Sequence, residues 1–269
     1  LQSRGLGDVY KRQSMVDILL SGQLLAAVKG MARICWIGDV NQLPSVGPGA
    51  VLRDLIDCGK IPVARLETIH RQSEKSRIAK NSKEIRKGSL ALDWGKDFQM
   101  ISADSIEETA EKIISLYATL VQEFSKEEVV VLTPYRRNTA TGSRQLNERI
   151  RDVMNPARQG IRELTVGKDR RIYRVGDRVM QCRNIGAVRN GDIGEIIDIK
   201  RDEATGEMIV LVRFEGGIQR EYARESLTEL ELAYAMTIHK SQGSEYRACI
   251  IACNIEHKRL LSRKTLYTA

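Results

Sequence analysis

The sequence predicts an α/β protein that carries a small β-rich module in its second half. Helical and strand-like apolar runs alternate from residue 14 to residue 157 and again after residue 228, as in layered α/β domains. Between them, residues 158–228 contain short β-type runs separated by turn signals. The chain has 269 residues, 42% of them apolar and only five prolines, which is enough for one large domain or two to three small ones.

Charge and cysteine content narrow the class of protein. Lys and Arg number 43 against 35 acidic residues, giving a net charge of +8, which favours a polyanionic partner such as nucleic acid. The five cysteines lack metal-ligand spacing, and there are only three histidines, so neither a zinc site nor a disulfide framework is expected. No apolar stretch reaches membrane-spanning length. We therefore expect a cytoplasmic protein without a membrane partner.

The first α/β stretch has two predicted helices and two predicted strands. Residues 15–28 show helical apolar spacing that ends at Gly30. The run Arg33-Ile-Cys-Trp-Ile37 predicts a buried strand. A Gly/Pro-rich loop then leads into a helix that begins near Val51 and is closed by Gly59. Residues 61–66 are a second candidate strand.

A second α/β unit follows. Ser105-Ile-Glu-Glu108 is a capping box that predicts a helix through residue 124. Residues 129–132 predict a central strand that ends at Thr133-Pro134. Apolar spacing from Leu146 to Met154 predicts an amphipathic helix stopped by Asn155-Pro156.

The β-rich module has four candidate strands, at residues 178–182, 193–199, 208–214 and 219–222. Asn190-Gly191 and Glu215-Gly-Gly217 are turn signals between them. This spacing indicates a small SH3-like or OB-like barrel. The α/β pattern resumes after Leu227, so the barrel is interpreted as an insertion in the second α/β domain.

The two ends of the chain look interrupted. Residues 1–13 are polar and aperiodic, and we interpret them as a leader that is not native. The last residues, Lys264 to Ala269, stop within a predicted element.

The loop Gly38-Asp39-Val-Asn-Gln42-Leu-Pro-Ser45 follows the carboxyl end of a predicted strand, where parallel α/β sheets bind ligands. The amide of Gln42 is suited to bonding a terminal phosphate or an attacking water. The segment resembles motif III of superfamily 1 helicases, and Val46-Gly-Pro-Gly49 resembles the RecD-like continuation of that motif.

Thr68-Ile-His70-Arg71-Gln72 is similar to motif IV of the same family. The resemblance implies that Arg71 reaches across the interdomain cleft to the γ-phosphate. A guanidinium suits this role because it stays charged and its fork matches phosphate oxygens. Gln42 and Arg71 are thus the predicted catalytic residues.

Residues 233–246 (AYAMTIHKSQGSEY) resemble motif V of RecD-like helicases. The resemblance places four residues near the DNA backbone: Thr237, His239, Lys240 and Ser241. It places three more towards the nucleotide, namely Gln242, Gly243 and Glu245. Together with Gly38, Asp39, Gln42 and Arg71, these three make up the predicted nucleotide-binding set.

Two further segments agree with this family. The first contains Thr133, Pro134, Tyr135 and Arg136 and resembles the start of the family's second domain, with groups that could track single-stranded DNA. For Tyr135, packing and base stacking are equally open. The second, residues 176–194, resembles the SH3-like insertion, and there a solvated barrel edge is the default interpretation.

The resemblance implies two RecA-like P-loop NTPase domains with a small SH3-like β-barrel inserted in the second. The expected domains are residues 14–67, the end of a truncated first domain; 68–157 with 229–269, the second domain; and 158–228, the barrel. ATP and Mg²⁺ are the implied cofactors and single-stranded DNA the implied partner. The implied activity is ATP-dependent 5′-to-3′ movement in DNA repair or recombination.

Three parts of the family's ATP site are absent from the sequence. No Gly-x-x-x-x-Gly-Lys-Ser/Thr loop occurs. The metal-binding Asp-Glu pair is expected just before Ser14, where Lys11-Arg12 stand, so no metal ligand is predicted in this chain. The motif VI arginine is expected after Ala269. We therefore expect the isolated chain to lack ATPase activity.

Several functions remain open within and beyond this class. The parent protein is predicted to be a stand-alone helicase, a relaxase–helicase fusion used in DNA transfer, or the RecD-type subunit of a recombination complex. From a different class, the chain could be a non-enzymatic remnant that binds single strands. A structural protein without a nucleic-acid role conflicts with the order of the motifs and the positive charge.

Overall fold

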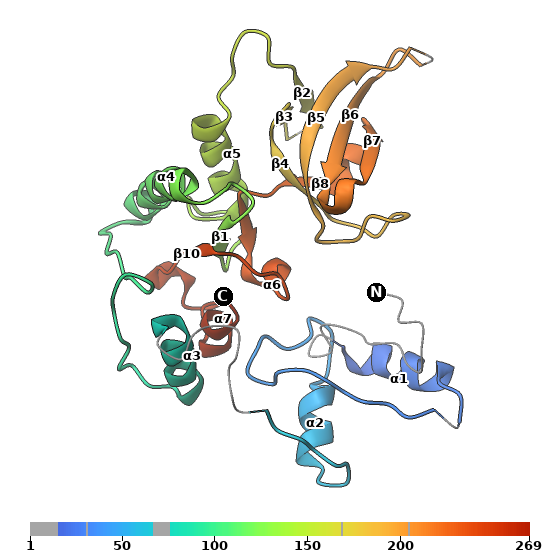
Figure 1. Cartoon of the computed structure of the whole chain (residues 1–269), viewed down its shortest axis with the longest axis vertical. Helices are drawn as coiled ribbons and strands as arrows, with labels where there is room; N and C mark the ends of the chain where they lie inside the picture. The colour runs from blue at the N-terminus through green and yellow to red at the C-terminus, as the bar shows by residue number, and fades with distance from the viewer. Residues whose placement is uncertain (1–15, 31, 67–75, 168, 204) are drawn as a thin grey trace. The chain divides into compact units, whose positions relative to one another are not determined.

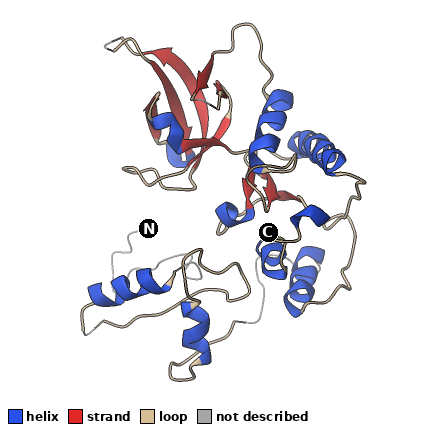
Figure 2. Ribbon diagram, turned by 180° about the vertical axis from the view of Figure 1, so that it is seen from behind, coloured by secondary structure: helices blue, strands red, loops and turns tan. Residues whose placement is uncertain are grey.

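The computed structural model describes residues 16–30, 32–66, 76–167, 169–203 and 205–269, which form two compact units. Unit 1 contains the described residues up to 101 together with 242–244 and 258–269. Unit 2 contains residues 102–241 and 245–257. The named strands of the described chain, drawn in red in Figure 2, all lie within the residue ranges of unit 2.

Within its described residues, unit 1 is built from short helices. They are α1 (Ile18–Ala27), α2 (Val51–Asp57), α3 (Arg77–Lys87) and α7 (Arg263–Thr268). Asp17 caps α1 by accepting a hydrogen bond from the Leu20 amide at 2.8 Å. Helix α3 ends at Gly88, whose φ of 82° is the left-handed conformation that glycine favours, and it packs against α7. The two helices predicted in residues 15–59 are confirmed.

The two strands predicted in unit 1 do not form. Residues 32–39 and 62–66 have no regular secondary structure, and Ile34 and Ile37 are 42% and 59% exposed. A parallel strand is stabilised by hydrogen bonds to a neighbouring strand, and the described part of unit 1 contains no such neighbour. The two strand predictions are therefore wrong, because an apolar run without a neighbouring strand to pair with stays irregular.

The core of unit 2 is a three-stranded parallel sheet. Its strands are β1 (Val129–Thr133), β9 (Ala235–Thr237) and β10 (Ala248–Ile251), in the order β10-β1-β9. Every residue of the central strand β1 is buried. The predicted central strand is therefore confirmed, and burial on both faces explains its continuous apolar run.

Two helices cover one face of this sheet (Figure 1). They are α4 (Ile106–Glu123) and α5 (Ser143–Met154). Ser105 caps α4 by accepting a hydrogen bond from the Glu108 amide, while the Glu108 carboxylate accepts one from the Asp104 amide. Both helices pack fully buried side chains against the sheet: Ala110, Tyr117, Leu146 and Ile150. Burial of one such large side chain contributes about 1.5–3 kcal/mol.

The β-rich module contains seven strands within the described residues. They are β2 (Glu163–Val166), β3 (Arg171–Arg174), β4 (Arg178–Gln181), β5 (Ile193–Arg201), β6 (Met208–Phe214), β7 (Gln219–Ala223) and β8 (Leu230–Leu232). Strands β2 and β3 form a hairpin, and the other five form an antiparallel sheet in the order β7-β6-β5-β4-β8. The four predicted strands are confirmed, whereas β2, β3 and β8 were not predicted.

The expected closed barrel is not found among the described residues. Strands β7 and β8 lie at opposite edges of the five-stranded sheet and do not pair with each other. The edge strand β8 has three residues and leads within two residues into β9 of the core sheet, so it is too short to pair along all of β7. The module is therefore a strongly connected open sheet around its own apolar core.

The chain returns from the module to the core sheet beside Asn147 of α5. The Asn147 Nδ2 donates to the carbonyl oxygens of Leu232 and Ala235, both at 2.8 Å. Its Oδ1 accepts from the Ala235 amide at 2.7 Å. Because these groups are buried, the three bonds specify the position of β9 beside β1.

A second buried polar group joins the module to the core. The Arg178 guanidinium donates to the carbonyl oxygens of Lys126 and Val129, both at 2.7 Å, and of Glu127 at 3.2 Å. The neighbouring Asp177 is fully buried, and burial raises the pKa of its carboxyl group. It accepts hydrogen bonds from the Asn155 side chain, the Tyr234 hydroxyl and the Arg174 amide.

We expect Asp177→Ala to lower the free energy of unfolding by about 3 kcal/mol, because it leaves three buried donors without an acceptor. Urea unfolding followed by far-UV circular dichroism measures this change. Glu203→Ala, at an exposed position of the module, is the control and should change the stability by less than about 0.5 kcal/mol. An equal effect of the two substitutions would contradict the structural role of Asp177.

Candidate functional site

The two segments predicted to contact DNA each begin where a strand of the parallel sheet ends, and these two strand ends lie side by side. Strand β1 ends at Thr133 and β9 ends at Thr237, and these two residues are register partners in the parallel pair. Ligands of parallel α/β sheets bind beyond such carboxyl ends. The structure therefore brings Thr133, Pro134, Tyr135 and Arg136 to the same edge as Thr237.

The loop after β1 is fixed by its own hydrogen bonds. The Thr133 hydroxyl donates to the Thr141 carbonyl at 2.7 Å. The Tyr135 carbonyl accepts from the Ser143 amide at 2.9 Å, at the start of α5. Thr133 and Pro134 are buried, whereas Tyr135 is half-buried and Arg136 is exposed. Thr133 and Pro134 thus shape the loop, and Tyr135 and Arg136 are the members that reach its surface.

A buried histidine contacts this loop through a hydrogen bond and a ring contact. His257, in the short helix η4 (Ile255–His257), is 1% exposed, and its Nε2 lies 2.8 Å from the Thr141 Oγ1. Its ring is 5.3 Å from the Tyr135 ring, centroid to centroid. Burial lowers the pKa of His257, so it is neutral at pH 7. The residue therefore positions both the threonine turn and Tyr135.

The segment after β9 begins with helix α6 (Ile238–Ser241). His239 is exposed, while Ser241 is buried and its hydroxyl donates to the Ile238 carbonyl at 2.9 Å. The Lys240 Nζ donates to the Glu231 Oε2 at 2.7 Å. The guanidinium of Arg136 forms an ion pair with the other oxygen of the same carboxylate. Two predicted DNA-binding cations from separate segments therefore meet at Glu231.

The predicted nucleotide-binding residues of unit 1 are organised around Asp39. Its Oδ1 accepts hydrogen bonds from the amide of Asn41 at 2.9 Å and from the Asn41 side chain at 3.1 Å. Its Oδ2 accepts one from the Tyr267 hydroxyl at 2.9 Å. Burial and the adjacent Asp39 carboxylate raise the pKa of Tyr267 to about 12. Tyr267 thus remains a hydrogen-bond donor to Asp39 at neutral pH.

Gln42 lies in the same turn and contacts the start of the Gln242–Ser244 segment. The Gln242 Nε2 lies 3.4 Å from both the Gln42 Oε1 and the Leu43 carbonyl oxygen. The Leu43 amide donates to the Thr268 Oγ1 at 3.0 Å. Gln242 is buried, whereas Gly38 and Gly243 are exposed. Asp39, Gln42 and Gln242, predicted from distant motifs, are therefore neighbours within unit 1.

Two predicted nucleotide-binding residues are not part of this group. Arg71, with the rest of its motif, lies outside the described residues. Glu245 is exposed and belongs to unit 2. Their predicted roles rest on the sequence alone.

Three supporting residues were not identified from the sequence. Glu231, His257 and Tyr267 each contact a predicted site residue, yet none belongs to a segment that was assigned a role. A single Glu, His or Tyr outside a motif cannot be recognised from the sequence, because only the fold brings its side chain to its partner. The nearest sequence signal is the position of Glu231, two residues before the motif that begins at Ala233.

Two kinds of feature are not found among the described residues, a metal-binding cluster and a membrane-spanning helix. These residues contain no cluster of three or more His, Cys, Asp or Glu side chains placed to hold a metal ion. The Asp39 carboxylate is instead bonded to Asn41 and Tyr267. No helix formed by these residues is both long and apolar enough to cross a lipid bilayer.

Three family models match consecutive parts of the chain. Residues 13–105 match a model described as an AAA domain. Residues 146–214 match the ATP-dependent RecD-like DNA helicase SH3 domain, and residues 232–269 match the UvrD-like helicase C-terminal domain. The open sheet of the module is therefore an SH3-like domain by sequence.

Individual proteins are similar over most of the chain. The ATP-dependent RecD2 DNA helicase of Deinococcus radiodurans is 31% identical over 259 residues, covering 95% of this chain and 33% of the relative. The RecBCD enzyme subunit RecD of Mycolicibacterium smegmatis is 29% identical, covering 97% and 47%. The conjugal transfer protein TraA of Rhizobium radiobacter is 28% identical, covering 84% and 20%. The chain thus spans between a fifth and about half of the length of these relatives.

We expect the free energy of unfolding to decrease as the pH is lowered below about 6.5, the pKa of an unfolded histidine. The folded pKa of His257 is lowered, so between the two pKa values the unfolded chain binds more protons than the folded chain. Urea titrations from pH 7.5 to pH 5 measure this loss. His257→Gln should reduce the pH dependence, whereas His239→Gln, at an exposed site, should leave it unchanged. If both variants keep the wild-type dependence, His257 does not cause it.

Proposed function

Because this chain belongs to the RecD-like superfamily 1 helicases, we propose that it forms the strand-binding part of an ATP-dependent DNA helicase. In the whole protein, ATP hydrolysis would be coupled to 5′-to-3′ movement along single-stranded DNA in repair or recombination. The observation that carries the proposal is the register of Thr133 with Thr237. It puts two motifs, about a hundred residues apart, at one edge of a parallel sheet.

The chemistry of this edge suits a nucleic-acid backbone. Arg136 and Lys240 supply charged donors, and the half-buried ring of Tyr135 adds an aromatic surface. Phosphate contacts fix the position of a strand without reading its sequence, and aromatic stacking tolerates any base. Such an edge is what a protein that moves along DNA of any sequence requires.

The nucleotide side of the proposal rests on Asp39, Gln42 and Gln242. Gln42 is proposed to orient a water or bond the terminal phosphate, and Arg71 to stabilise charge on that phosphate. Bound Mg²⁺ would neutralise phosphate charge, but the described residues offer no carboxylate cluster for it. We therefore assign only ATP contacts to Asp39, Gln42 and Gln242.

The proposed architecture is two RecA-like domains with an SH3-like module in the second. Residues 14–67 would belong to the first domain, residues 68–157 and 229–269 to the second, and residues 158–228 to the module. The similarity to a RecBCD enzyme subunit RecD supports partner subunits in a recombination complex. The similarity to a conjugal transfer protein supports a helicase used in DNA transfer as the alternative.

The 269-residue chain is expected to bind single-stranded DNA with an affinity that falls steeply as salt concentration rises. Fluorescence anisotropy of a labelled oligo(dT) measures the affinity. Lys240→Gln should weaken binding by about five- to tenfold, because one phosphate contact is lost. Lys200→Gln is the matched control, since Lys200 is also paired with a glutamate, Glu221, at 3.0 Å. Equal binding by the two variants would remove Lys240 from the DNA site.

In a longer protein that carries this sequence together with a phosphate-binding loop, Gln42→Ala should lower DNA-stimulated ATP hydrolysis about a hundredfold. Arg71→Ala should lower it about a thousandfold. A coupled assay of ADP release in the presence of oligo(dT) measures both rates. Gln122→Ala, at an exposed position of α4, should hydrolyse ATP at the wild-type rate. Unchanged turnover in Gln42→Ala or Arg71→Ala would exclude that residue from the ATP site.

A further inference from the structure

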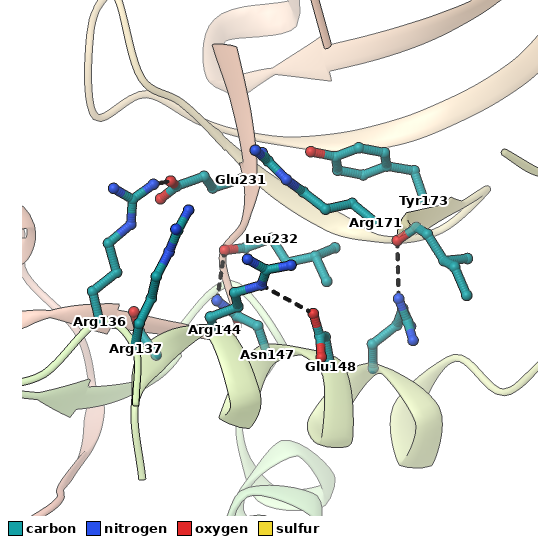
Figure 3. A pocket seen from close by; sticks show the side chains of 12 residues that line it. Arg136, Arg137, Arg144, Asn147, Glu148, Arg171, Tyr173, Glu231 and Leu232 are labelled. Atoms are coloured by element: carbon teal, nitrogen blue, oxygen red, sulfur yellow. Dashed lines mark hydrogen bonds and ion pairs between the residues drawn. The ribbon is translucent and has the colours of Figure 1, made fainter. Parts of the chain in front are cut away.

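A cationic pocket lies where the SH3-like module meets the core of unit 2. It is a partly open pocket with a cavity volume of about 60 Å³, bounded by the loop after β1, helix α5, strand β3 and strand β8. Five arginines line it: Arg136, Arg137, Arg144, Arg151 and Arg171. Figure 3 shows arginines rising from the core side and Arg171 extending from the module towards Glu231. We call this site the arginine pocket.

Two of the arginines hold the walls of the pocket together. Arg144 forms ion pairs with Glu148 at 3.4 Å and with Asp169, in the β2–β3 turn, at 2.9 Å. Arg151 donates to the Ile172 carbonyl at 2.9 Å and pairs with Asp152. These guanidinium groups attach the module's hairpin to α5 and are committed to that role.

Arg137 and Arg171 are different, because neither forms an ion pair with a carboxylate among the described residues. Their charges still act in the same space. The pKa of Asp169 is lowered first by its hydrogen bond and ion pair with Arg144, and then by the charges of Arg137 and Arg171. Two guanidinium groups, one from the core and one from the module, are therefore available to an anion in this pocket.

Glu231 connects the arginine pocket with the predicted DNA edge. Its carboxylate lines the pocket and is bonded by both Lys240 and Arg136. Only 22% of the side chain is exposed. A carboxylate presents two oxygens to cationic donors much as a phosphate does. In the protein without DNA, Glu231 is thus paired with the two cations that would otherwise bind a phosphate of the strand.

We propose that the arginine pocket binds a backbone phosphate of single-stranded DNA through Arg137 and Arg171, and that Glu231 is the counter-ion which DNA phosphates replace at Arg136 and Lys240. The proposal rests on the function proposed above and extends it from the sheet edge onto the module. One strand would pass from the Thr133–Thr237 edge, across Arg136, to Arg171. The module is then part of the DNA track.

The energetics allow the exchange. A partly exposed ion pair contributes little to stability, so Glu231 holds the two cations in place without binding them too tightly to release. Arginine donates from a planar fork that matches phosphate oxygens. The negative charge of Glu231 also offsets the repulsion between the two cations until a DNA strand binds.

The phosphate site is tested by Arg171→Gln and Arg137→Gln in the 269-residue chain, with labelled oligo(dT) and salt titrations. Each variant should bind about five- to tenfold more weakly than the wild type, and the slope of log affinity against log salt should become shallower by about 0.7, the value for one phosphate contact on a single strand. Arg201→Gln removes an equal charge from an exposed site of the module and should keep the wild-type slope. Arg171→Lys should restore most of the slope, and thermal melting checks that each variant is folded.

The counter-ion is tested by Glu231→Gln. Loss of its charge should tighten oligo(dT) binding at least about fivefold, because it releases two partly exposed ion pairs, those with Arg136 and Lys240. Glu203→Gln changes the net charge equally at an exposed site and should have a much smaller effect. Weaker or unchanged binding by Glu231→Gln, relative to Glu203→Gln, would overturn the displacement and make Glu231 a positioning residue only.

The outcomes separate the two levels of the proposal. A chain that binds no oligo(dT) overturns the proposed function and this extension together. A chain that binds oligo(dT), loses affinity in Lys240→Gln, and is indistinguishable among Arg171→Gln, Arg137→Gln and Arg201→Gln overturns the arginine pocket alone.

Discussion

The carboxamide of Asn147 bonds the backbone on both sides of the place where the chain returns from the module to the core sheet. More than seventy residues separate the end of α5 from β9, and a strand shift of one residue would reverse the faces of all its side chains. The three hydrogen bonds of Asn147 work against such a shift. The pairing of Thr133 with Thr237, and hence the candidate DNA edge, therefore depends on these three hydrogen bonds.

The edge combines partly exposed ion pairs with a hydrogen-bonded frame. Thr133, Thr141 and His257 form a buried chain of hydrogen bonds beneath the loop, so the backbone around Tyr135 does not depend on a ligand for its shape. The cations above it are paired with a carboxylate in a partly exposed position, where such pairs contribute little to stability. A rigid frame with exchangeable counter-ions lets a strand bind and move on without refolding the site.

The sequence predicted elements where local pattern and tertiary environment agree. The buried run of β1, the capped helix α4 and strands β4, β5, β6 and β7 of the module all carry strong local signals. It failed for residues 33–37 and 61–66, because a strand needs a neighbour that the local pattern does not reveal. It also missed β8, whose three residues are defined only by pairing with β4, and it predicted closure of a barrel from strand spacing, although spacing does not specify which edges pair.

The candidate site shows the same division. Motif residues such as Gln42, Thr237 and Lys240 could be predicted because they occur in ordered, recognisable segments. Glu231, His257 and Arg171 could not, because their importance comes from proximity across 9 to 116 residues of sequence, as in the pairs Glu231–Lys240 and Thr141–His257. The anchor of the module has a mechanical meaning of its own. Arg178 is hydrogen-bonded to the backbone at the amino end of β1. The DNA edge lies at the carboxyl end of the same strand, about 13 Å away at the usual rise of a strand. A force applied to the module would therefore be transmitted to the DNA edge through one buried strand, and not only through the segments that connect the module to the core.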